Sequence, residues 1–497
     1  MKTPSHLATT ALTLALLASA CSSKTTHAPS FPSDALAGKC QSPRPGTGDR
    51  AGTAADEKAW LRAWTDDLYL WYREVAARTD LDPTGYATPQ DYFEVLKTPA
   101  LTASGRARDQ FHFHMPTAEW EALASSGSEL GYGMQVVLLS RSPPRRALVA
   151  YVEPGSPAAR ASIDRGAEIL EVDGAVLLDG DPAVINGGLF PADTTPHTLV
   201  LADAGASLSR SVTMTPATVA MTPVPAPVVV QSPGGRKVGY VIMNDHLQAA
   251  EAGMTSAITQ VRAAGVDDVV LDLRYNGGGY MLVASQTAYM LAGPARTSAR
   301  IFERTIFNDK YPGIDPVAGG TVDMPFYPYR YFGSRGSALP TLSLPRLIVL
   351  TGGGTCSASE SLMNGLAGVD LPVYQIGTTT CGKPYGFYPK DNCGTTWFSI
   401  QFQGVNAKGF GDYADGLVPG GTGGASFPGC AVADDFLHAL GDPAEARLAA
   451  ALAWADTGAC PALPAAQAAR VREALAQERE WVLPRSLARE MRLPLSR

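Results

Sequence analysis

The sequence predicts a mixed α/β protein built from three successive units, the last of which contains a largely parallel sheet. Three observations lead to this class: an aromatic-rich helical pattern near residue 60, short strands with turns from 128 to 218, and apolar strands alternating with helices after 236. Strands that alternate with helices form parallel sheets with helices on their faces. A chain of 497 residues is long enough for two or three such domains.

The first unit, 56–127, is predicted to be helical. Its apolar side chains recur at spacings of four and three, which places them on one face of an amphipathic helix. This face consists of Trp60, Trp64, Leu68, Trp71 and Val75. Aromatic residues at this density are typical of a hydrophobic core, so no catalytic role is assigned to them.

The second unit, 128–218, resembles a PDZ domain. A glycine-containing loop, 131–134, precedes an alternating strand, and a Gly-Ser-Pro-Ala turn at 155–158 leads into a short helix. The resemblance implies that backbone N–H groups of the loop bind the terminal carboxylate of a peptide, which then adds as a strand. Matched by position, the peptide-binding residues are Tyr132, Gly133 and Met134. The alternative is a small β-domain without a ligand.

In the third unit, 236–462, two apolar strands are each followed by a segment of glycine and polar residues. Functional sites of open parallel sheets form beyond the carboxyl ends of the strands. Asn276 and three glycines, 277–279, follow the strand at 269–273, and Ser357 follows the strand at 347–350 and opens a helix. Such glycines allow the backbone to approach a ligand and to donate N–H groups to an oxyanion. No phosphate-loop motif is present in either segment.

Ser357 and Lys383 are the candidate nucleophile and base. A hydroxyl at a helix N-terminus lies where the helix dipole favours negative charge, although most serines at this position are only caps. Lys383 follows the next strand, in the run Thr379-Thr380-Cys381-Gly382-Lys383. A lysine of ordinary pKa, ~10.4, is almost fully protonated at neutral pH, whereas burial favours the neutral amine that a base requires.

Three motifs together resemble the carboxyl-terminal processing (tail-specific) proteases of peptidase family S41. They are D-L-R-x-N-x-G-G at 272–279, G-x-x-S-A-S-E at 354–360 and T-x-x-G-K at 379–383. The resemblance implies a crotonase/ClpP-like catalytic domain, an N-terminal helical domain and an inserted PDZ domain. It also implies a serine endopeptidase that reads the C-terminal tails of exported polypeptides.

The family pattern assigns the nucleophile to Ser357 and the general base to Lys383. The oxyanion donors would be the backbone N–H groups of Ala358 and of Gly278 or Gly279. Phe387 stands where the family commonly has a glutamine, four residues after the lysine. No cofactor is expected.

Two alternatives remain at the level of the sequence. His246 could serve as the base in place of Lys383, although no second dyad is evident around it. The chain could also be a catalytically silent binding or scaffold lipoprotein on the same fold, which acyl-thioester hydratases share. Retention of both Ser357 and Lys383 argues against the silent protein, and an export signal argues against acyl-thioester chemistry.

The N-terminus predicts export and lipid anchoring. Lys2 is followed by an apolar run, 7–20, that ends in small residues before Cys21. Such a segment is too short for a membrane span and resembles a bacterial lipoprotein signal, 1–21, with Cys21 as the lipidated residue; plain secretion is the alternative. We expect a flexible linker over 22–55, a helical tail over 463–497, and a location at the periplasmic side of the outer membrane.

The net charge and the cysteine content limit which partners, disulfides and metal sites the sequence predicts. The net charge is −7 with scattered basic residues, which disfavours a nucleic-acid partner. Six cysteines remain besides Cys21, an even number that favours disulfides; with no C-x-x-C and no histidine at ligand spacing, a metal site is not expected. The expected pairings are Cys381–Cys393, Cys430–Cys460 and, by elimination, Cys40–Cys356. A Cys356–Cys381 bridge is the main alternative.

Overall fold

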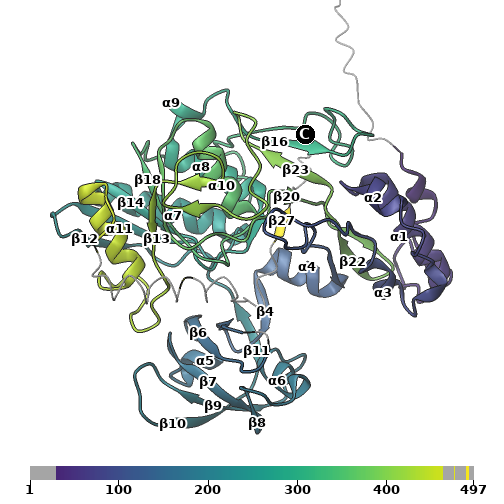
Figure 1. Ribbon diagram of the computed structural model, residues 1–497, viewed down its shortest axis with the longest axis horizontal. Coiled ribbons are helices and arrows are strands. Elements are labelled where there is room, and N and C mark those ends of the chain that lie inside the picture. The colour runs from purple at the N-terminus through teal and green to yellow at the C-terminus, as the bar shows by residue number, and fades with distance from the viewer. Residues whose placement is uncertain (1–29, 141, 463–474, 476–488, 492–497) are drawn as a thin grey trace, which may run out of the picture.

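The computed structural model describes residues 30–140, 142–462, 475 and 489–491 (Figure 1). The signal segment, the lipidation site at Cys21 and most of the expected helical tail therefore lie outside the described residues. Across the described ranges, no helix is both long enough and apolar enough to cross a membrane.

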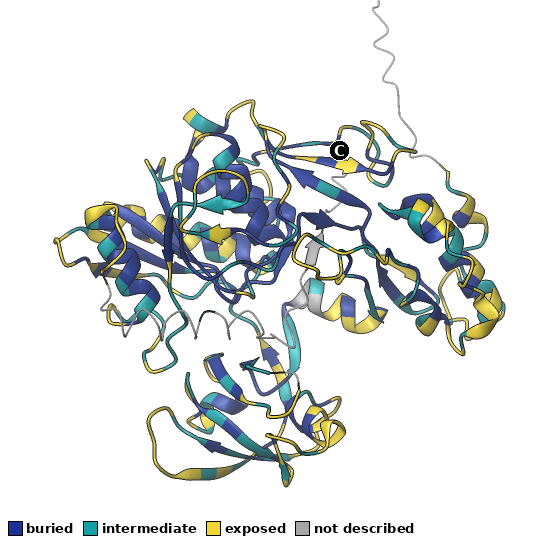
Figure 2. Ribbon diagram, in the orientation of Figure 1, coloured by how far each residue is buried: buried dark blue, intermediate teal, exposed yellow. Residues whose placement is uncertain are grey.

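A six-stranded sheet forms the centre of the third unit. Its strand order is β12-β13-β14-β18-β19-β26, with β12 antiparallel to β13 and the other neighbours parallel. The strands are β12 (Val228–Gln231), β13 (Lys237–Ile242), β14 (Asp268–Asp272), β18 (Leu347–Thr351), β19 (Val373–Gly377) and β26 (Gly429–Ala431). Every residue of β14 and β18 is buried, as expected for strands covered on both faces (Figure 2).

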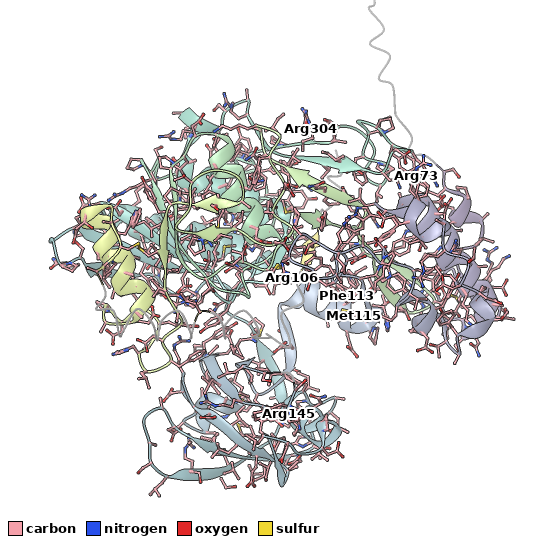
Figure 3. The ribbon with its side chains drawn as sticks, in the orientation of Figure 1. Arg73, Arg106, Phe113, Met115, Arg145 and Arg304 are labelled. Atoms are coloured by element: carbon pink, nitrogen blue, oxygen red, sulfur yellow. A yellow bond between two sulfur atoms is a disulfide. The ribbon has the colours of Figure 1, made fainter. Side chains whose placement is uncertain are left out.

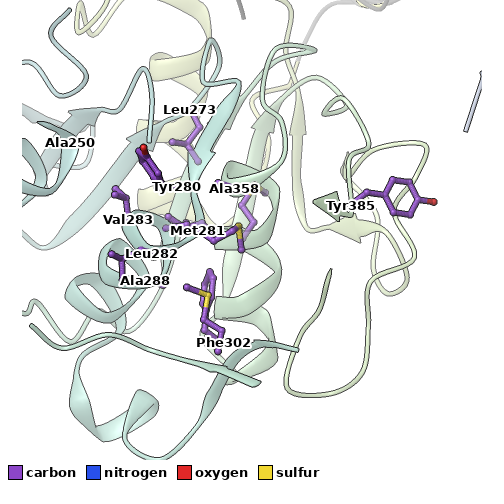
Figure 4. Close-up of a cluster of buried hydrophobic side chains, with 14 of the residues drawn as sticks. Ala250, Leu273, Tyr280, Met281, Leu282, Val283, Ala288, Phe302, Ala358 and Tyr385 are labelled. Atoms are coloured by element: carbon purple, nitrogen blue, oxygen red, sulfur yellow. The ribbon is translucent and has the colours of Figure 1, made fainter. Parts of the chain in front are cut away.

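Helices cover both faces of this sheet. α7 (Gln248–Ala264), α8 (Met281–Ala292) and α10 (Ala358–Gly368) pack on one face, where Leu271 and Val349 belong to the main core. α11 (Ala446–Thr457) packs on the other face, where Val270 and Ile348 cluster with Leu448. Successive side chains of a strand point to opposite faces, which explains the division. Figure 4 shows Met281, Leu282, Val283 and Phe302 beside Ala358 in the main core.

Smaller elements flank the central sheet. An antiparallel sheet of order β17-β16-β23-β20 lies beside it, and β24 pairs with β25. The elements are α9 (Pro294–Thr297), β16 (Ile301–Phe307), β17 (Asp323–Pro325), β20 (Tyr385–Gly386), β23 (Phe402–Val405), β24 (Val418–Pro419) and β25 (Ser426–Phe427).

The N-terminal helical unit shares its core with the central unit. Its elements are α1 (Ala54–Leu68), α2 (Tyr72–Ala76), η2 (Pro83–Gly85), α3 (Pro89–Phe93), β3 (Phe113–Pro116) and α4 (Thr117–Ser126). β3 pairs with β22 (Thr395–Phe398), which also pairs with β21 (Lys390–Asn392). The Phe113 ring stacks on Phe398 at 4.2 Å between centroids, and Figure 3 shows Phe113 and Met115 at this junction.

The flexible linker expected over 22–55 is wrong for residues 30–55. This segment contains η1 (Pro32–Ala35), β1 (Lys39–Cys40) and β2 (Arg50–Ala51), and Phe31 and Leu36 pack against the main core. Cys40 is fully buried and bonded to Cys393. The Pro- and Gly-rich composition reflects tight turns held by a disulfide rather than a loose chain.

The β-rich unit is a six-stranded antiparallel sheet with two short helices. Its main path runs β10-β9-β7-β6-β5, so β5 forms an edge, while β8 pairs with β7. A ribbon of β4 and β11 joins this unit to its neighbours (Figure 1). The elements are β4 (Ser128–Gly131), β5 (Met134–Leu138), β6 (Ala147–Val152), α5 (Pro157–Arg160), β7 (Glu168–Val172), β8 (Ala175–Val176), α6 (Pro182–Leu189), β9 (His197–Ala202), β10 (Ser209–Met214) and β11 (Ala217–Ala220).

Two of the three expected disulfide pairings are wrong. The structure pairs Cys430 with Cys460, as expected, but pairs Cys40 with Cys393. It also pairs Cys356 with Cys381, which was the main alternative from the sequence. The expectation favoured short loops, whereas the Cys40–Cys393 bridge spans 353 residues. Sheet topology brings these cysteines together, and spacing along the chain carries no information on that.

The expected helical tail is wrong at Arg489–Met491, whereas Leu475, its other described residue, is helical. Residues 489–491 form strand β27, which runs parallel to β15 (Gly278–Tyr280) in the glycine-rich loop after β14.

Candidate active site

The topology of the sheet brings the three motif segments together. β14, β18 and β19 are parallel neighbours, and the segments follow them at the same edge of the sheet. The Cys356 N–H donates to the carbonyl of Asn276 at 3.0 Å, and the Cys381 N–H donates to the carbonyl of Thr355 at 3.0 Å. The Cys356–Cys381 disulfide adds a covalent link between the second and third segments.

Ser357 occupies a strained turn between β18 and α10. Its backbone angles are φ 59° and ψ −118°, which few residues other than glycine adopt. The side chain is fully buried, and its hydroxyl has no hydrogen-bond partner among the described residues. A serine on a sharp, strained strand-to-helix turn is the geometry of a nucleophile elbow.

Glu360 connects the serine turn to the lysine loop. One carboxylate oxygen accepts from the N–H groups of Ser357 at 3.0 Å and Lys383 at 2.8 Å. The other accepts from the Gly382 N–H at 2.9 Å and the Thr380 hydroxyl at 2.5 Å. Complete burial raises the pKa of Glu360, while these hydrogen bonds act to lower it. The sequence analysis missed this residue, although a Glu three positions after a helix cap is a known capping signal.

Lys383 is fully buried beside two aromatic rings. Its Nζ lies 4.2 Å from the ring centroid of Phe387 and 5.3 Å from that of Phe111. Phe387 thus contacts the lysine from the position where the family commonly has a glutamine. Phe111 comes from the N-terminal unit, and no sequence signal connected it with the lysine.

Gly278 lies directly against the serine turn. A Cβ at this position would be 2.8 Å from Ser357 Cβ and 3.1 Å from the Ala358 nitrogen. The Gly278 N–H already donates to Asn276 Oδ1 at 2.9 Å. As the first residue of α10, Ala358 carries one of the N–H groups that helix geometry leaves without an intrahelical partner.

His246 lies on the other side of the glycine strand. The Tyr280 N–H donates to its carbonyl and its own N–H donates to the carbonyl of Gly278, both at 2.9 Å. The ring is fully buried, with Nδ1 3.0 Å from Asn276 Oδ1, which as an acceptor requires the proton on Nδ1. Burial lowers the pKa of His246 to about 4, so the imidazole is neutral at physiological pH.

Cys356, Glu360 and Cys381 place potential ligand atoms within 4.8 Å of one another. Both sulfurs belong to the disulfide, so neither is the thiolate that a metal would require. The group is therefore not a metal centre in this oxidised form.

The three predicted peptide-binding residues lie together at the start of edge strand β5. The buried Tyr132 hydroxyl donates to the carbonyl of Gly188 in α6 at 2.9 Å. Gly133 has φ 69°, and a Cβ there would be 2.4 Å from Ser156 Cβ. Met134 begins β5, whose outer edge has no partner strand among the described residues.

Comparison with known proteins agrees with this architecture. Residues 237–386 match the family model described as peptidase family S41, and residues 56–111 match the peptidase S41 N-terminal domain. The first match contains both Ser357 and Lys383. Residues 56–111 and 237–386 thus carry the N-terminal and peptidase parts of family S41.

Among its relatives are processing peptidases. A carboxyl-terminal-processing protease of Picosynechococcus sp. is 27% identical over 170 residues, 33% of this chain and 39% of that protein. The chloroplastic carboxyl-terminal-processing peptidase 3 of Arabidopsis thaliana is 29% identical over 178 residues, 34% of this chain and 33% of that protein. The matched regions thus span about a third of these relatives' lengths.

A solved structure shows the same fold. It comes from Bacteroides fragilis NCTC 9343, and its name assigns it to the S41 proteases. The TM-score is 0.58 at 23% sequence identity, and the similarity covers 80% of this chain and 97% of that one.

We expect Gly278→Ala to destabilise the fold by about 2–5 kcal/mol, because the new methyl group adds steric overlap to a backbone angle that alanine avoids. The overlap is with Ser357 and Ala358. The matched control is Gly265→Ala, which also has a positive φ, of 62°, but meets open space and should cost only about 1–2 kcal/mol. Denaturant unfolding measures both. Equal losses would contradict the close approach of Gly278 to the serine turn.

We expect His246 to make the fold acid-sensitive. Its folded-state pKa of about 4 lies below the ordinary value of 6.5, so between these pH values the unfolded chain binds a proton that the folded chain does not. Stability is therefore lost as pH falls from 6.5 to 4, by about 3 kcal/mol.

His246→Asn keeps a donor near the Nδ1 position and removes the titrating group. Denaturant unfolding at several pH values should show a shallower loss of stability for this variant than for the native chain. An unchanged slope would show that His246 is not the buried neutral imidazole described above.

Proposed function

We propose that the chain is a serine peptidase in which Ser357 is the nucleophile and Lys383 the general base. The observation that carries this proposal is the Ser357 turn. Its buried hydroxyl has no partner within the described part of the chain, and its strained backbone lies at the N-terminus of α10. Strain of this kind costs about 1–3 kcal/mol and persists where the surrounding structure enforces it, commonly at active sites.

The reaction follows from the chemistry of the two side chains. Ser357 Oγ attacks the carbonyl carbon of the scissile peptide bond and gives its proton to the neutral amine of Lys383. The resulting ammonium returns this proton to the leaving nitrogen as the C–N bond breaks, which leaves an acyl-serine. Water then attacks the ester, with the amine again as base, and releases the new carboxyl terminus.

The oxyanion formed in each step needs N–H donors close to the serine. The Ala358 N–H and the Gly279 N–H are the donors we propose. Gly278, the other candidate from the sequence, has its N–H engaged by Asn276 and is less suited. Donors fixed in a buried site stabilise the developing charge without reorganisation.

The surroundings of Lys383 support its role as a base. Its side chain is completely buried, which removes bulk water from the amine. Phe387 and Phe111 restrict where the amine can lie. Glu360 accepts a hydrogen bond from the main-chain N–H of Lys383 and so positions the backbone of the lysine.

His246 is the alternative base, because its imidazole is neutral and buried near the same loop. Its Nδ1 proton is held by Asn276, and Gly278 and Gly279 separate its backbone from the serine turn. We favour Lys383, which Glu360 ties to the Ser357 backbone. A silent scaffold protein would have no need of the strained Ser357 backbone.

We further propose that the 128–218 unit is a PDZ domain that binds substrate C-termini through Tyr132, Gly133 and Met134. Among the described strands β5 has no partner on its outer edge, and Tyr132 just before it contacts α6, which supports strand addition by a peptide. Three disulfides support an oxidising compartment outside the cytoplasm. Export by the 1–21 signal and a lipid anchor at Cys21, facing the periplasm, remain parts of this proposal.

Ser357→Ala and Lys383→Arg should each reduce hydrolysis of an unstructured protein by about 10³–10⁶-fold with the fold intact. The arginine variant is inactive because a guanidinium cannot give up its proton near neutral pH. Hydrolysis is measured by the release of new amino termini, and folding by circular dichroism.

Two matched variants serve as controls. Ser359→Ala removes a hydroxyl that already donates to the carbonyl of Asn276 at 3.2 Å, and Lys408→Arg changes an exposed lysine paired with Asp370. Both should keep substantial activity. Loss of activity in Ser359→Ala but not in Ser357→Ala would overturn the assignment of the nucleophile. Loss in His246→Asn but not in Lys383→Arg would identify the histidine as the base.

Peptides with a free, apolar C-terminus should bind the full chain more tightly than the same peptides with a C-terminal amide. The reason is that backbone N–H groups at 132–134 would bind the carboxylate, which the amide lacks. Fluorescence anisotropy with the Ser357→Ala chain measures both affinities without cleavage. Equal affinities would contradict the PDZ assignment.

A further inference from the structure

The chain's own C-terminal segment lies in the candidate active site. β27 runs parallel to β15, with Arg489 opposite Gly278, Glu490 opposite Gly279 and Met491 opposite Tyr280. β15 is the strand whose Gly278 presses against the Ser357 turn.

β27 also lies against β20, which begins two residues after Lys383. Figure 1 draws β27 in yellow directly below β20. The segment therefore lies between the strand beside the nucleophile and the strand beside the lysine.

The edge of β15 that β27 occupies is the one that the proposed reaction needs. Backbone groups of a strand alternate in direction, and His246 takes the Gly278 carbonyl and the Tyr280 N–H on one side. The Gly279 N–H and carbonyl consequently face the other side, toward β27. A peptide substrate and β27 cannot both use this edge.

We propose that residues 489–491 are an intramolecular peptide ligand of the substrate groove and compete with substrate for it. This inference rests on the proposed peptidase function, which makes the groove between β15 and β20 the substrate's. Recognition is by main-chain pairing, the mode by which an extended peptide adds to an exposed strand edge. The occupant is thus of the same chemical class as the substrate, an extended polypeptide.

A short peptide of this kind binds weakly when it is free, but it competes effectively when it is tethered to the same chain. The 26 residues between Ala462 and Arg489 could span at most about 90 Å if fully extended. A tether that reaches its site can give an effective concentration of about a millimolar. A segment with a dissociation constant of about 0.1–1 mM would then occupy the groove for half to nine-tenths of the time. Its removal should therefore raise the apparent affinity for substrate by about 2–10-fold.

Two truncations distinguish the effect of β27 from the effect of the residues that follow it. Deletion of 489–497 removes β27, whereas deletion of 492–497 keeps it and serves as the matched control. Both are made in the Ser357→Ala chain, so that no cleavage interferes. A fluorescein-labelled peptide of residues 485–497 should bind the first chain about 2–10-fold more tightly than the second, by anisotropy. Equal binding to the two chains would overturn the proposal.

Steady-state hydrolysis of an unstructured protein by the serine-containing chains gives a second readout. A competitor raises KM and leaves kcat unchanged, so deletion of 489–497 should lower KM relative to deletion of 492–497. A lower kcat with an unchanged KM would overturn competition. If neither chain hydrolyses the protein, the proposed peptidase function fails, while the anisotropy measurement still decides whether the segment occupies the groove.

Discussion

The buried carboxylate of Glu360 is the contact on which the candidate site depends. Glu360 lies in the first turn of α10. Its carboxylate oxygens accept hydrogen bonds from the serine turn that precedes the helix and from the lysine loop that follows β19. One fully buried carboxylate thus satisfies backbone N–H groups from both segments, which would otherwise be costly to bury. The Cys356–Cys381 disulfide reinforces the same connection. The candidate nucleophile Ser357 and the candidate base Lys383 are therefore held by the same carboxylate.

A second buried network connects the β-rich unit to the loop that follows β14. Arg165 of that unit donates to Asp434 at 2.7 Å and to the Tyr275 hydroxyl at 2.6 Å. Arg274, the neighbour of Tyr275, is fully buried and paired with Asp272, Asp434 and Glu445 at 2.8–2.9 Å. Buried charges are tolerated only when paired and hydrogen-bonded, so the position of the β-rich unit is fixed against the loop that carries Gly278 and Gly279.

Much of the site could be predicted because its residues follow consecutive strands of one sheet. Asn276, Ser357 and Lys383 each come after an apolar strand, and parallel neighbours end at a common edge. Glu360 was within the recognised motif but was not assigned a role. Phe111 could not have been found, because its contact with Lys383 depends on how the N-terminal unit packs on the central one.

The sequence by itself determined the order of the units, the alternation of strands and helices, and the residue types at the edge of the sheet, since these depend on local periodicity and turn chemistry. Tertiary structure decided the disulfide partners, the packing of residues 30–55 and the pairing of Arg489–Met491 with the glycine strand. Two of these features, the Cys40–Cys393 disulfide and the pairing of Gly278 with Arg489, join segments hundreds of residues apart. The distance between two residues along the sequence does not predict such contacts. They depend on which strand edges and apolar faces are still uncovered once the sheet has formed.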